Sequence, residues 1–561
     1  MFDFTQHVAT RLRRLATGLA GTTPQAEPIP GTTQVPNAAG GFAWGVDRWT
    51  RLDRFLVLGS EGGTFHVGER TLTREGAASA QACLAEDGPR AVARVVEVSA
   101  SGRAARNDPA LFVLALAAAA EDPATRAAAL AALPRVARTG THLFHFLQYL
   151  KAFRGWGRGV RAAVGRWYTQ RAPRELAYQV MKYQARDGWS HRDALRLAHP
   201  APPTPTHDLL FRFAARGWDA AVERRGVAET DVVERLEAMH AVRGMPPADA
   251  ARVIAIYGLT REMVPTGLLA HAVVWEALLE GMPLGALVRN LGVMTRVGLL
   301  APGAAATATV AATFCAGSAI ARTPLHPLAL LAALRTYARG RGMRGSGAWA
   351  PVPAVADALD GAFYRAFGAV PSTGRRVLLA LDVSGSMAAP VHGLPFVSCR
   401  EASAAMALVT AAVEPSYRAV AFTDGARPSL HSASGLGSGL TPLALSARQR
   451  LDDVLRATAA LRFGGTDCAL PMLEARRHRW EVDAFVVYTD SETWAGDVHP
   501  AQALRAYRER TGLAARLVVV AMASNGFSIA DPDDAGMLDV VGFDAATPHV
   551  IADFIGAGGA A

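Results

Sequence analysis

Between residues 377 and 521, short apolar runs alternate with longer amphipathic segments, and this alternation restricts the possible folds more than any other feature. The apolar runs cover residues 377–381, 418–422, 484–488 and 516–521. The segments with helical periodicity cover residues 398–413, 447–461 and 500–510. Strands that alternate with helices form parallel sheets with crossover helices on both faces. The sequence therefore predicts a doubly wound α/β domain, to which we assign residues 371–561.

Oxygen-bearing side chains follow two of these predicted strands. The first strand is followed by the sequence DVSGS, and the third ends at an aspartate, with a threonine in the sequence GGTD between them. Ligands of open α/β sheets bind beyond the carboxyl ends of the strands, and carboxylate and hydroxyl oxygens suit Mg²⁺. DVSGS alone would also fit an N-capping turn, but the two further donors favour a metal. The predicted magnesium ligands are Asp382, Ser384, Ser386, Thr466 and Asp490.

A magnesium ion held in this way would keep a coordination position open, because few side chains contribute and Mg²⁺ retains several waters. That position could bind an oxygen of a partner or support hydrolysis. Hydrolysis needs a base or a second metal ion, and His392 fits a surface loop better than a general base. The sequence therefore favours docking over catalysis.

The region from about residue 75 to 350 has a helical pattern. Helix starts are predicted at Asp108-Pro109 and at Thr230-Asp231, and short Gly and Pro breaks separate the helices. The apolar run at residues 111–120 ends at two acids, which favours a buried helix over a membrane span. Helices of similar length joined by short turns predict a helical-repeat array, although no regular sequence period is evident.

Two stretches outside the predicted helices and strands are distinguished by their composition. Residues 1–33 are rich in Thr, Pro and Gly, which predicts a mobile arm that becomes ordered only by packing on the rest. A Gly- and Arg-rich stretch at residues 339–347 is the expected connection between the two halves. We therefore assign the helical domain to residues 34–370.

Positive charge is concentrated in the N-terminal part. The formal net charge is +9, but residues 371–561 carry 16 arginines and 20 acids, so residues 1–370 carry +13. One acid-free segment, residues 151–174, contains Lys151, Arg154, Arg158, Arg161, Arg166, Arg171 and Arg174. A solvated helix face could look like this, but the absence of acids favours nucleic acid, whose phosphates relieve the repulsion. The spacing places Arg154, Arg158 and Arg161 on one helix face, with Lys151 beside them.

Aromatic and polar residues lie in and directly after this basic segment. Trp156, Trp167 and Tyr168 could stack on bases, but such spacing is more typical of core residues. Lys182 and Arg186 are four residues apart, which predicts one helical turn and a shared nucleic-acid backbone.

The segment that follows predicts a second helix start. Ser190 and Asp193 have the spacing of a helix N-cap, and a helix N-terminus attracts anions. Judged without their neighbours, His191 and His199 are each more typical of residues that pack in a core than of residues that bind a ligand.

The four cysteines, Cys83, Cys315, Cys399 and Cys468, are dispersed, without CxxC pairs. Neither a zinc site nor a disulfide framework is indicated. No apolar segment follows the N-terminal arginines as a signal peptide would require. We therefore expect a cytoplasmic protein.

Residues 182–199 closely resemble the Ro autoantigen family, whose N-terminal part is called the TROVE domain. The resemblance extends over about residues 34–500. DVSGS with the distant Thr466 and Asp490 is similar to the metal-ion-dependent adhesion site of von Willebrand A domains. Further similar segments are residues 35–41 (VPNAAGG), 54–64 (RFLVLGSEGGT), 154–159 (RGWGRG), 261–266 (REMVPT), 282–292 (MPLGALVRNLG), 326–328 (HPL) and 464–468 (GGTDC).

This resemblance implies a ring of α-helical HEAT-like repeats closed by a von Willebrand A domain. It implies that Y-like non-coding RNA binds the outer face through Lys182, Arg186 and His199, and that single-stranded 3′ ends of misfolded or structured RNA enter the hole. A monomeric ring without catalysis of its own, acting in RNA quality control, is expected, with neither DNA nor a membrane as partner. One departure is Ser491, where relatives commonly carry Asn.

In bacteria, the resemblance suggests a nuclease partner, polynucleotide phosphorylase, for which the ring would act as a scaffold. From a different class, the chain could be a metal-dependent protein-docking adaptor whose basic surface is incidental. A metal-dependent hydrolase is the third alternative.

Overall fold

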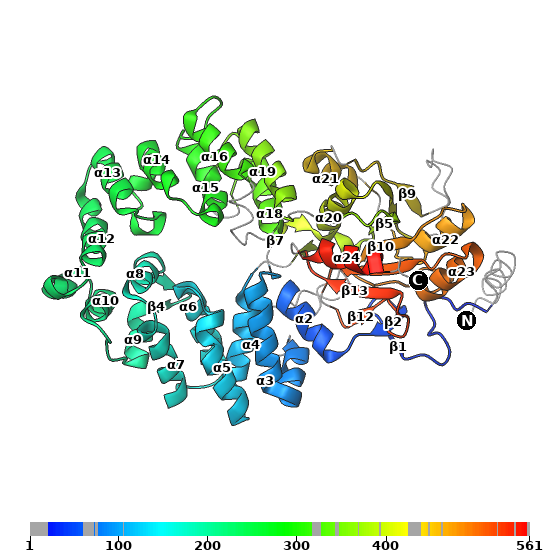
Figure 1. Cartoon of the computed structure of the whole chain (residues 1–561), viewed down its shortest axis with the longest axis horizontal. Helices are drawn as coiled ribbons and strands as arrows, with labels where there is room; N and C mark the ends of the chain where they lie inside the picture. Colours follow the sequence, from blue (N-terminus) through cyan, green and yellow to red (C-terminus); the bar gives the residue numbers. More distant parts are fainter. Residues whose placement is uncertain are drawn as a thin grey trace.

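The computed structural model describes residues 21–59, 72, 77–104, 106–316, 327–342, 347–367, 370–391, 394–424, 439–446, 449–459, 461, 464–523, 525–543 and 546–557. They form an arc of α-helices and an α/β domain (Figure 1). The α/β domain contacts the first and the last helices of the arc, so the chain closes on itself. This is the ring of helices closed by an α/β domain that the resemblance implied.

Most of the arc consists of helices that pack against the next helix or the second-next helix in sequence, for example α3 on α4 and α5, and α4 on α6. The helices are α2 (Arg48–Leu58), α3 (Ala78–Ser101), α4 (Asp108–Ala119), α5 (Pro123–Val136), α6 (Gly140–Phe153), α7 (Arg158–Thr169), α8 (Pro173–Lys182), α9 (His191–Ala198), α10 (Pro205–Arg216), α11 (Trp218–Ala221), α12 (Thr230–Ala241), α13 (Pro247–Tyr257), α14 (Ala272–Glu280), α15 (Leu284–Arg296), α16 (Ala305–Cys315), α18 (Pro327–Ala338) and α19 (Pro353–Arg365). A short hairpin, β3 (Ala185–Arg186) and β4 (Trp189–Ser190), separates α8 from α9.

The predicted helix starts are confirmed. Helix α4 begins at Asp108 with Pro109 in its first turn, where the missing N–H of proline costs nothing. Helix α12 begins at Thr230. Every residue of α4 from Pro109 to Ala118 is buried, so this apolar helix lies in the core, as predicted.

The C-terminal domain contains a six-stranded sheet in the order β13-β11-β10-β5-β8-β9. All neighbouring pairs are parallel except β8 and β9, which are antiparallel. The four strands predicted from apolar runs are present, whereas β13 and the antiparallel edge strand β9 were not predicted. The strands are β5 (Arg376–Asp382), β8 (Ser416–Phe422), β9 (Leu440–Pro442), β10 (Ala484–Thr489), β11 (Arg516–Ala521) and β13 (Met537–Val541). A separate hairpin is formed by β6 (Pro390–Val391) and β7 (Leu394–Ser398).

Helices cover both faces of this sheet. They are α20 (Cys399–Val413), α21 (Leu451–Ala459), α22 (Leu470–Arg477), α23 (Pro500–Thr511) and α24 (Thr547–Gly556). Successive strand residues point to opposite faces, so Leu379 of β5 packs in the cluster that contains α20, and Leu378 in the cluster that contains α22 and α23. The first cluster continues into the helical arc, which ties the two parts together through one apolar core.

Polar contacts close the ring at both ends of the arc. At the first end, the fully buried Arg54 of α2 donates to the backbone oxygen of Asn525 at 2.9 Å and pairs with Asp539 of β13 at 2.6 Å. At the other end, Arg335 of α18 pairs with Glu401 of α20, and Asp357 of α19 pairs with Arg450 at 2.5 Å. The first junction is therefore the more deeply buried one.

The segment before α2 also packs on the C-terminal domain. Strands β1 (Gln34–Pro36) and β2 (Phe42–Gly45) form a sheet with β12 (Phe527–Ser528), so strands join the two domains where the sequence predicted only helices. Gln25 is fully buried, and its amide nitrogen donates to Asp467 Oδ1 at 2.7 Å. Of the predicted arm, residues 21–33 are described and are held by such contacts, and residues 1–20 lie outside the described part.

All four cysteines are unpaired, and only Cys315 is exposed. None of the described helices is both long and apolar enough to cross a lipid bilayer.

Candidate functional site

Three of the predicted metal ligands lie together directly after β5. Asp382 ends the strand without exposed surface, and its Oδ1 accepts a hydrogen bond from the Ser384 backbone N–H at 2.8 Å. The hydroxyls of Ser384 and Ser386 lie 3.0 Å apart. The short helical turn that begins at Ser386 has Gly385 at its N-cap and no side-chain cap, so these side chains do not serve as a helix cap.

Asp490 supplies a second buried carboxylate after β10, the strand next to β5. Its Oδ1 accepts a hydrogen bond from the Glu492 N–H at 3.1 Å, whereas the buried Oδ2 has no hydrogen-bond partner among the described residues. Burial raises the pKa of both Asp382 and Asp490, and the nearby charge of Asp490 raises that of Asp382 further. A divalent cation would relieve both the repulsion and the unpartnered oxygen.

Thr466 reaches the same edge of the sheet from another loop. Its backbone oxygen accepts a hydrogen bond from the Trp494 N–H at 3.0 Å, and Asp467 N–H donates to the oxygen of Thr423, just after β8, at 3.0 Å. Thr466 is buried, but within the described part of the chain its hydroxyl bonds to none of the other four predicted ligands. The structure therefore joins Asp382, Ser384 and Ser386 through hydrogen bonds and places Asp490 close enough to raise the pKa of Asp382. Thr466 lies at the same edge on a separate loop.

The donor set fits magnesium. All five side chains offer oxygen, the ligand type that Mg²⁺ and Ca²⁺ prefer, and two of them are carboxylates. In the part of the chain that the structure describes, no group of three or more His, Cys, Asp and Glu side chains is arranged to hold a metal. His392, the base considered for hydrolysis, lies outside the described residues.

The basic segment of the arc is exposed, but it is not one continuous helix face. Helix α6 ends at Phe153 and α7 starts at Arg158, so Arg154 lies outside both helices and only Arg158 and Arg161 share a helix. The predicted common face for all three arginines was therefore wrong, because Gly155 and Gly157 interrupt the helix.

The arginines of this segment differ in their partners. Arg171 pairs with Glu175 at 2.9 Å, and Arg174 pairs with Asp231 at 2.7 Å, so acids outside residues 151–174 neutralise them. Among the described residues, no ion pair is formed by the five exposed cations Lys151, Arg154, Arg158, Arg161 and Arg166. We call these five residues the unpaired basic surface.

The aromatic residues of the segment are mainly core, as predicted. Trp167 is fully buried, and its Nε1 donates to the oxygen of Ala137 at 2.6 Å. Tyr168 is fully buried against His191, with 2.7 Å between Oη and Nδ1. Trp156 is half-buried and packs edge-on against Trp189.

Lys182 and Arg186 do not lie on one helix. Helix α8 ends at Lys182, and Arg186 belongs to the β3–β4 hairpin, so the prediction from their spacing was wrong. Turn-forming Asp187 and Gly188, both with positive φ, explain the hairpin. Lys182 Nζ donates to Tyr178 Oη at 2.6 Å, and the side chain of Arg186 is exposed.

Two carboxylates and a histidine hold this hairpin. His145 of α6 contacts Asp108 Oδ1 through Nδ1 at 2.6 Å and Asp187 Oδ2 through Nε2 at 3.0 Å. Burial alone would raise the pKa of Asp108, but the hydrogen bond with His145 and the charge of Arg106 lower it to about 2. The ring of His145 thus connects the helical arc to the turn that displays Arg186.

Helix α9 begins at the predicted N-cap, where Ser190 and Asp193 form a capping box. The two histidines at the ends of this helix differ in burial. His191 is buried, which confirms its packing role, and burial lowers its pKa to about 4. His199 is exposed at the C-terminal end of α9, with φ of 46°, so packing does not explain it.

Comparison with known proteins fits this geometry. Residues 35–336 match the TROVE domain and residues 376–555 match the Ro60 vWA domain. The chain belongs to the Ro60 family. The RNA-binding protein RO60 of Deinococcus radiodurans is 42% identical over 95% of this chain and 97% of its own, and RO60 of Caenorhabditis elegans is 34% identical over 93% and 90%. The crystal structure of the D. radiodurans RO (RSR) protein is similar with a TM-score of 0.67, at 40% identity, over 91% of this chain and 100% of that one.

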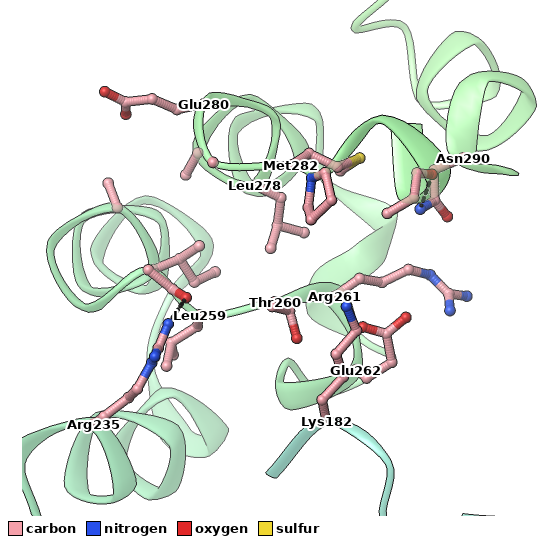
Figure 2. Close-up of a pocket in the computed structure, with 17 residues that line it drawn as sticks. Lys182, Arg235, Leu259, Thr260, Arg261, Glu262, Leu278, Glu280, Met282 and Asn290 are labelled. Carbon is pink, nitrogen blue, oxygen red and sulfur yellow. Dashed lines mark hydrogen bonds between the residues drawn. The ribbon is translucent and has the colours of Figure 1, made fainter. Parts of the chain in front are cut away.

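This Ro60-family chain also contains a cavity at a place where no sequence motif had predicted a site. It has a volume of about 380 Å³ and lies beside Lys182, bordered by Arg261, Asn290 and several apolar residues (Figure 2). Both residues fall within segments that resemble the Ro family, residues 261–266 and 282–292. The resemblance alone marked these segments, since neither shows a charge run or a metal-ligand spacing.

Proposed function

We propose that this Ro60-family protein binds RNA, and that the unpaired basic surface carries most of the non-specific part of that binding. The relatives from D. radiodurans and C. elegans are both named RNA-binding proteins. Exposed cations that have no protein partner gain most from phosphates, because each contact releases a counterion from the nucleic acid. The five cations of this surface meet that condition.

A structured, Y-like small RNA is the expected ligand of the outer surface. Its contacts would be Lys182, Arg186 and His199, together with the unpaired basic surface. Exposure of Arg186 and His199 supports this assignment, since neither side chain is engaged in the core. Because Lys182 and Arg186 lie on different elements, they would bind separate phosphates and not one stretch of backbone.

The second RNA site we propose is the opening of the ring, which would take single-stranded 3′ ends of misfolded or structured RNA. In this function the protein is a scaffold for RNA quality control, without catalysis of its own, and a ring-shaped exonuclease such as polynucleotide phosphorylase would degrade the RNA. The attachment of both arc ends to one domain supports a closed opening.

The buried oxygen cluster would hold a divalent ion, which we propose to be Mg²⁺, through Asp382, Ser384, Ser386, Thr466 and Asp490. The bound ion would supply positive charge and an open position for an oxygen of a partner. Asp382 and Asp490 would bind and orient it, and their burial would keep bulk water out. This part of the proposal rests on the unpartnered Oδ2 of Asp490.

Filter binding of a structured small RNA over a range of salt concentrations tests the RNA proposal. Lys182→Ala combined with Arg186→Ala should weaken binding and reduce the dependence of log K on log salt, by about 0.9 for each lost duplex phosphate contact. Arg477→Ala serves as the control, because Arg477 lies in the C-terminal domain and is paired with Glu474. Unchanged affinity and slope in the double variant would remove both residues from the interface.

The docking-adaptor alternative predicts that crosslinking in cells recovers a protein partner but no specific RNA. Sequencing the RNA that copurifies with the protein decides between the two. The hydrolase alternative predicts magnesium-dependent cleavage that Asp382→Ala abolishes. RNA that stays intact with the purified, magnesium-loaded protein would exclude it.

A further inference from the structure

The cavity beside Lys182 is bordered by α8, by α12 through Arg235, by α13, α14 and the start of α15, and by the turn at residues 261–263 (Figure 2). Its volume of about 380 Å³ falls in the range of roughly 300–1,000 Å³ of small-molecule sites. Of the RNA-contact residues predicted from the sequence, only Lys182 borders it. The cavity therefore adjoins the proposed RNA surface but is distinct from most of it.

One end of the cavity is cationic. Lys182 and Arg261 lie there with a single acid, Glu262, and Arg261 has no ion pair in the described part of the chain. Burial would lower the pKa of Lys182, but the hydrogen bond with Tyr178 and the neighbouring tyrosines and Glu262 raise it, so the ammonium remains charged at neutral pH.

The other side of the cavity is apolar. Leu259 and Leu278 are buried, Met282 is half-buried, and all three line it. Asn290 stands between the apolar and the cationic side (Figure 2). Its Nδ2 donates to the oxygen of Ala286 at 2.9 Å, and its Oδ1 accepts no hydrogen bond from the described residues. An apolar wall beside a free amide oxygen suits a flat ring with donors along its edge.

We propose that this cavity takes one unpaired nucleotide of the bound RNA. The base would pack on Leu259, Leu278 and Met282, with its edge at Asn290, and the phosphate would lie between Lys182 and Arg261. This inference rests on the proposed RNA-binding function, because the shared Lys182 makes an RNA, and not a free metabolite, the expected source of the nucleotide. It makes the cavity a recognition site for single-stranded bases beside a surface that binds phosphates.

The full-length protein can be tested with small probes, namely AMP, UMP and ribose 5-phosphate, by titration calorimetry. Both nucleotides should bind about tenfold more tightly than ribose 5-phosphate, because packing of the base adds to the phosphate contact. Ala286→Phe fills the cavity and should abolish this difference. Asn290→Ala, a smaller change, should reduce it and serves if the larger side chain disturbs folding.

Two glutamates provide a matched pair of charge variants. Glu262→Gln should strengthen the binding of all three probes a few-fold, because it removes the one acid at the cationic end. Glu280→Gln should change nothing, because the carboxylate of Glu280 points away from the cavity (Figure 2). Equal effects of the two substitutions would overturn the predicted position of the phosphate.

A photo-crosslinking measurement links the cavity to RNA. An oligouridylate that contains 4-thiouridine should crosslink to a peptide within residues 254–290, and Ala286→Phe or Asn290→Ala should reduce that product severalfold. If RNA binds with a normal salt dependence but crosslinks only elsewhere, and nucleotides bind no better than ribose 5-phosphate, the cavity inference is wrong while RNA binding stands. If no RNA binds at low salt, the proposed function fails and the inference fails with it.

Discussion

The oxygen cluster of the C-terminal domain and the basic surface of the helical arc are opposites in burial and in charge balance. The side chains of Asp382 and Asp490 lie close to each other and are at most 3% exposed. Asp490 Oδ2 has no hydrogen-bond partner among the described residues. Lys151, Arg158 and Arg161 are exposed and form no ion pair with any acid that the structure describes. These two features support the proposal that a cation binds the buried site and that an anion binds the exposed one. The buried site suits one small ion, and the exposed site suits a polyanion that contacts many positions.

The largest expected effect concerns the buried site. Mg²⁺ at about one hundred times its Kd should raise the free energy of unfolding by about 2.7 kcal/mol, because it binds only the folded chain. Asp382→Ala should lose this increase entirely, as measured by urea unfolding in Mg²⁺ and in EDTA.

Asp483→Asn is the matched control for this measurement. Asp483 pairs with Arg376 at the opposite end of β5 and β10, far along the strands from the cluster. It should therefore keep the full response to Mg²⁺. A wild-type protein that Mg²⁺ does not stabilise would show that the cluster is a hydrogen-bonded core and not a metal centre.

Asp108 is a half-buried carboxylate that is paired with a side chain of the protein. It tests whether a paired carboxylate affects stability differently from the carboxylates of the proposed metal site. Asp108 contacts His145, and its pKa is lowered from 3.8 to about 2, so the carboxylate stabilises the fold above about pH 4. That contribution, about 2 kcal/mol, should be lost as the pH falls from about 4 to 2. Asp108→Asn should be less stable at neutral pH and should show a shallower loss in acid, measured by urea midpoints from pH 6 to 2. Parallel profiles for the two proteins would contradict this.

How much the sequence could predict follows the same division between the two domains. In the C-terminal domain, apolar runs, two of them ending near Asp382 and Asp490, predicted four of the six strands, their parallel direction and the place where the oxygens meet, because strand ends converge by geometry. In the arc, i, i+4 spacing implied helical turns from Arg154 to Arg158 and from Lys182 to Arg186 that the chain does not form. Glycines and a turn interrupt the helices there, and spacing alone cannot show this.

Contacts between distant segments were beyond sequence reasoning. Gln25 with Asp467, and Arg54 with Asp539, join residues more than four hundred positions apart. Nothing in either local sequence marks such a partner. The cavity at Asn290 is similar, since it forms where α8, α12, α13, α14 and α15 meet.

Substitutions in the unpaired basic surface should change the salt dependence of RNA binding more than they change the stability of the fold. Arg158→Gln with Arg161→Gln should weaken RNA binding by about tenfold at moderate salt and reduce the slope of log K against log salt by about two. The free energy of unfolding should change by less than about 0.5 kcal/mol, because both side chains are exposed and unpaired.

The paired arginine of the same segment supplies the control. Arg174→Gln removes a cation that is already neutralised by Asp231, so the slope should change much less. If Arg174→Gln weakens binding as strongly as the double variant, pairing within the protein does not decide which cations meet the RNA.

The smallest effect tests how rigid the buried site is. Ser491 follows the proposed metal ligand Asp490 and is buried, with φ of 62°, a left-handed conformation that costs a residue with a Cβ roughly 1 kcal/mol. Ser491→Gly should therefore raise the free energy of unfolding by about 0.5–1 kcal/mol, measured by urea unfolding, and leave the Mg²⁺ response unchanged. Asparagine also tolerates left-handed φ, but its larger side chain must fit a buried site. A loss of stability or of the Mg²⁺ response in Ser491→Gly would mean that the serine hydroxyl itself supports the ion, so that the cluster has a sixth oxygen donor.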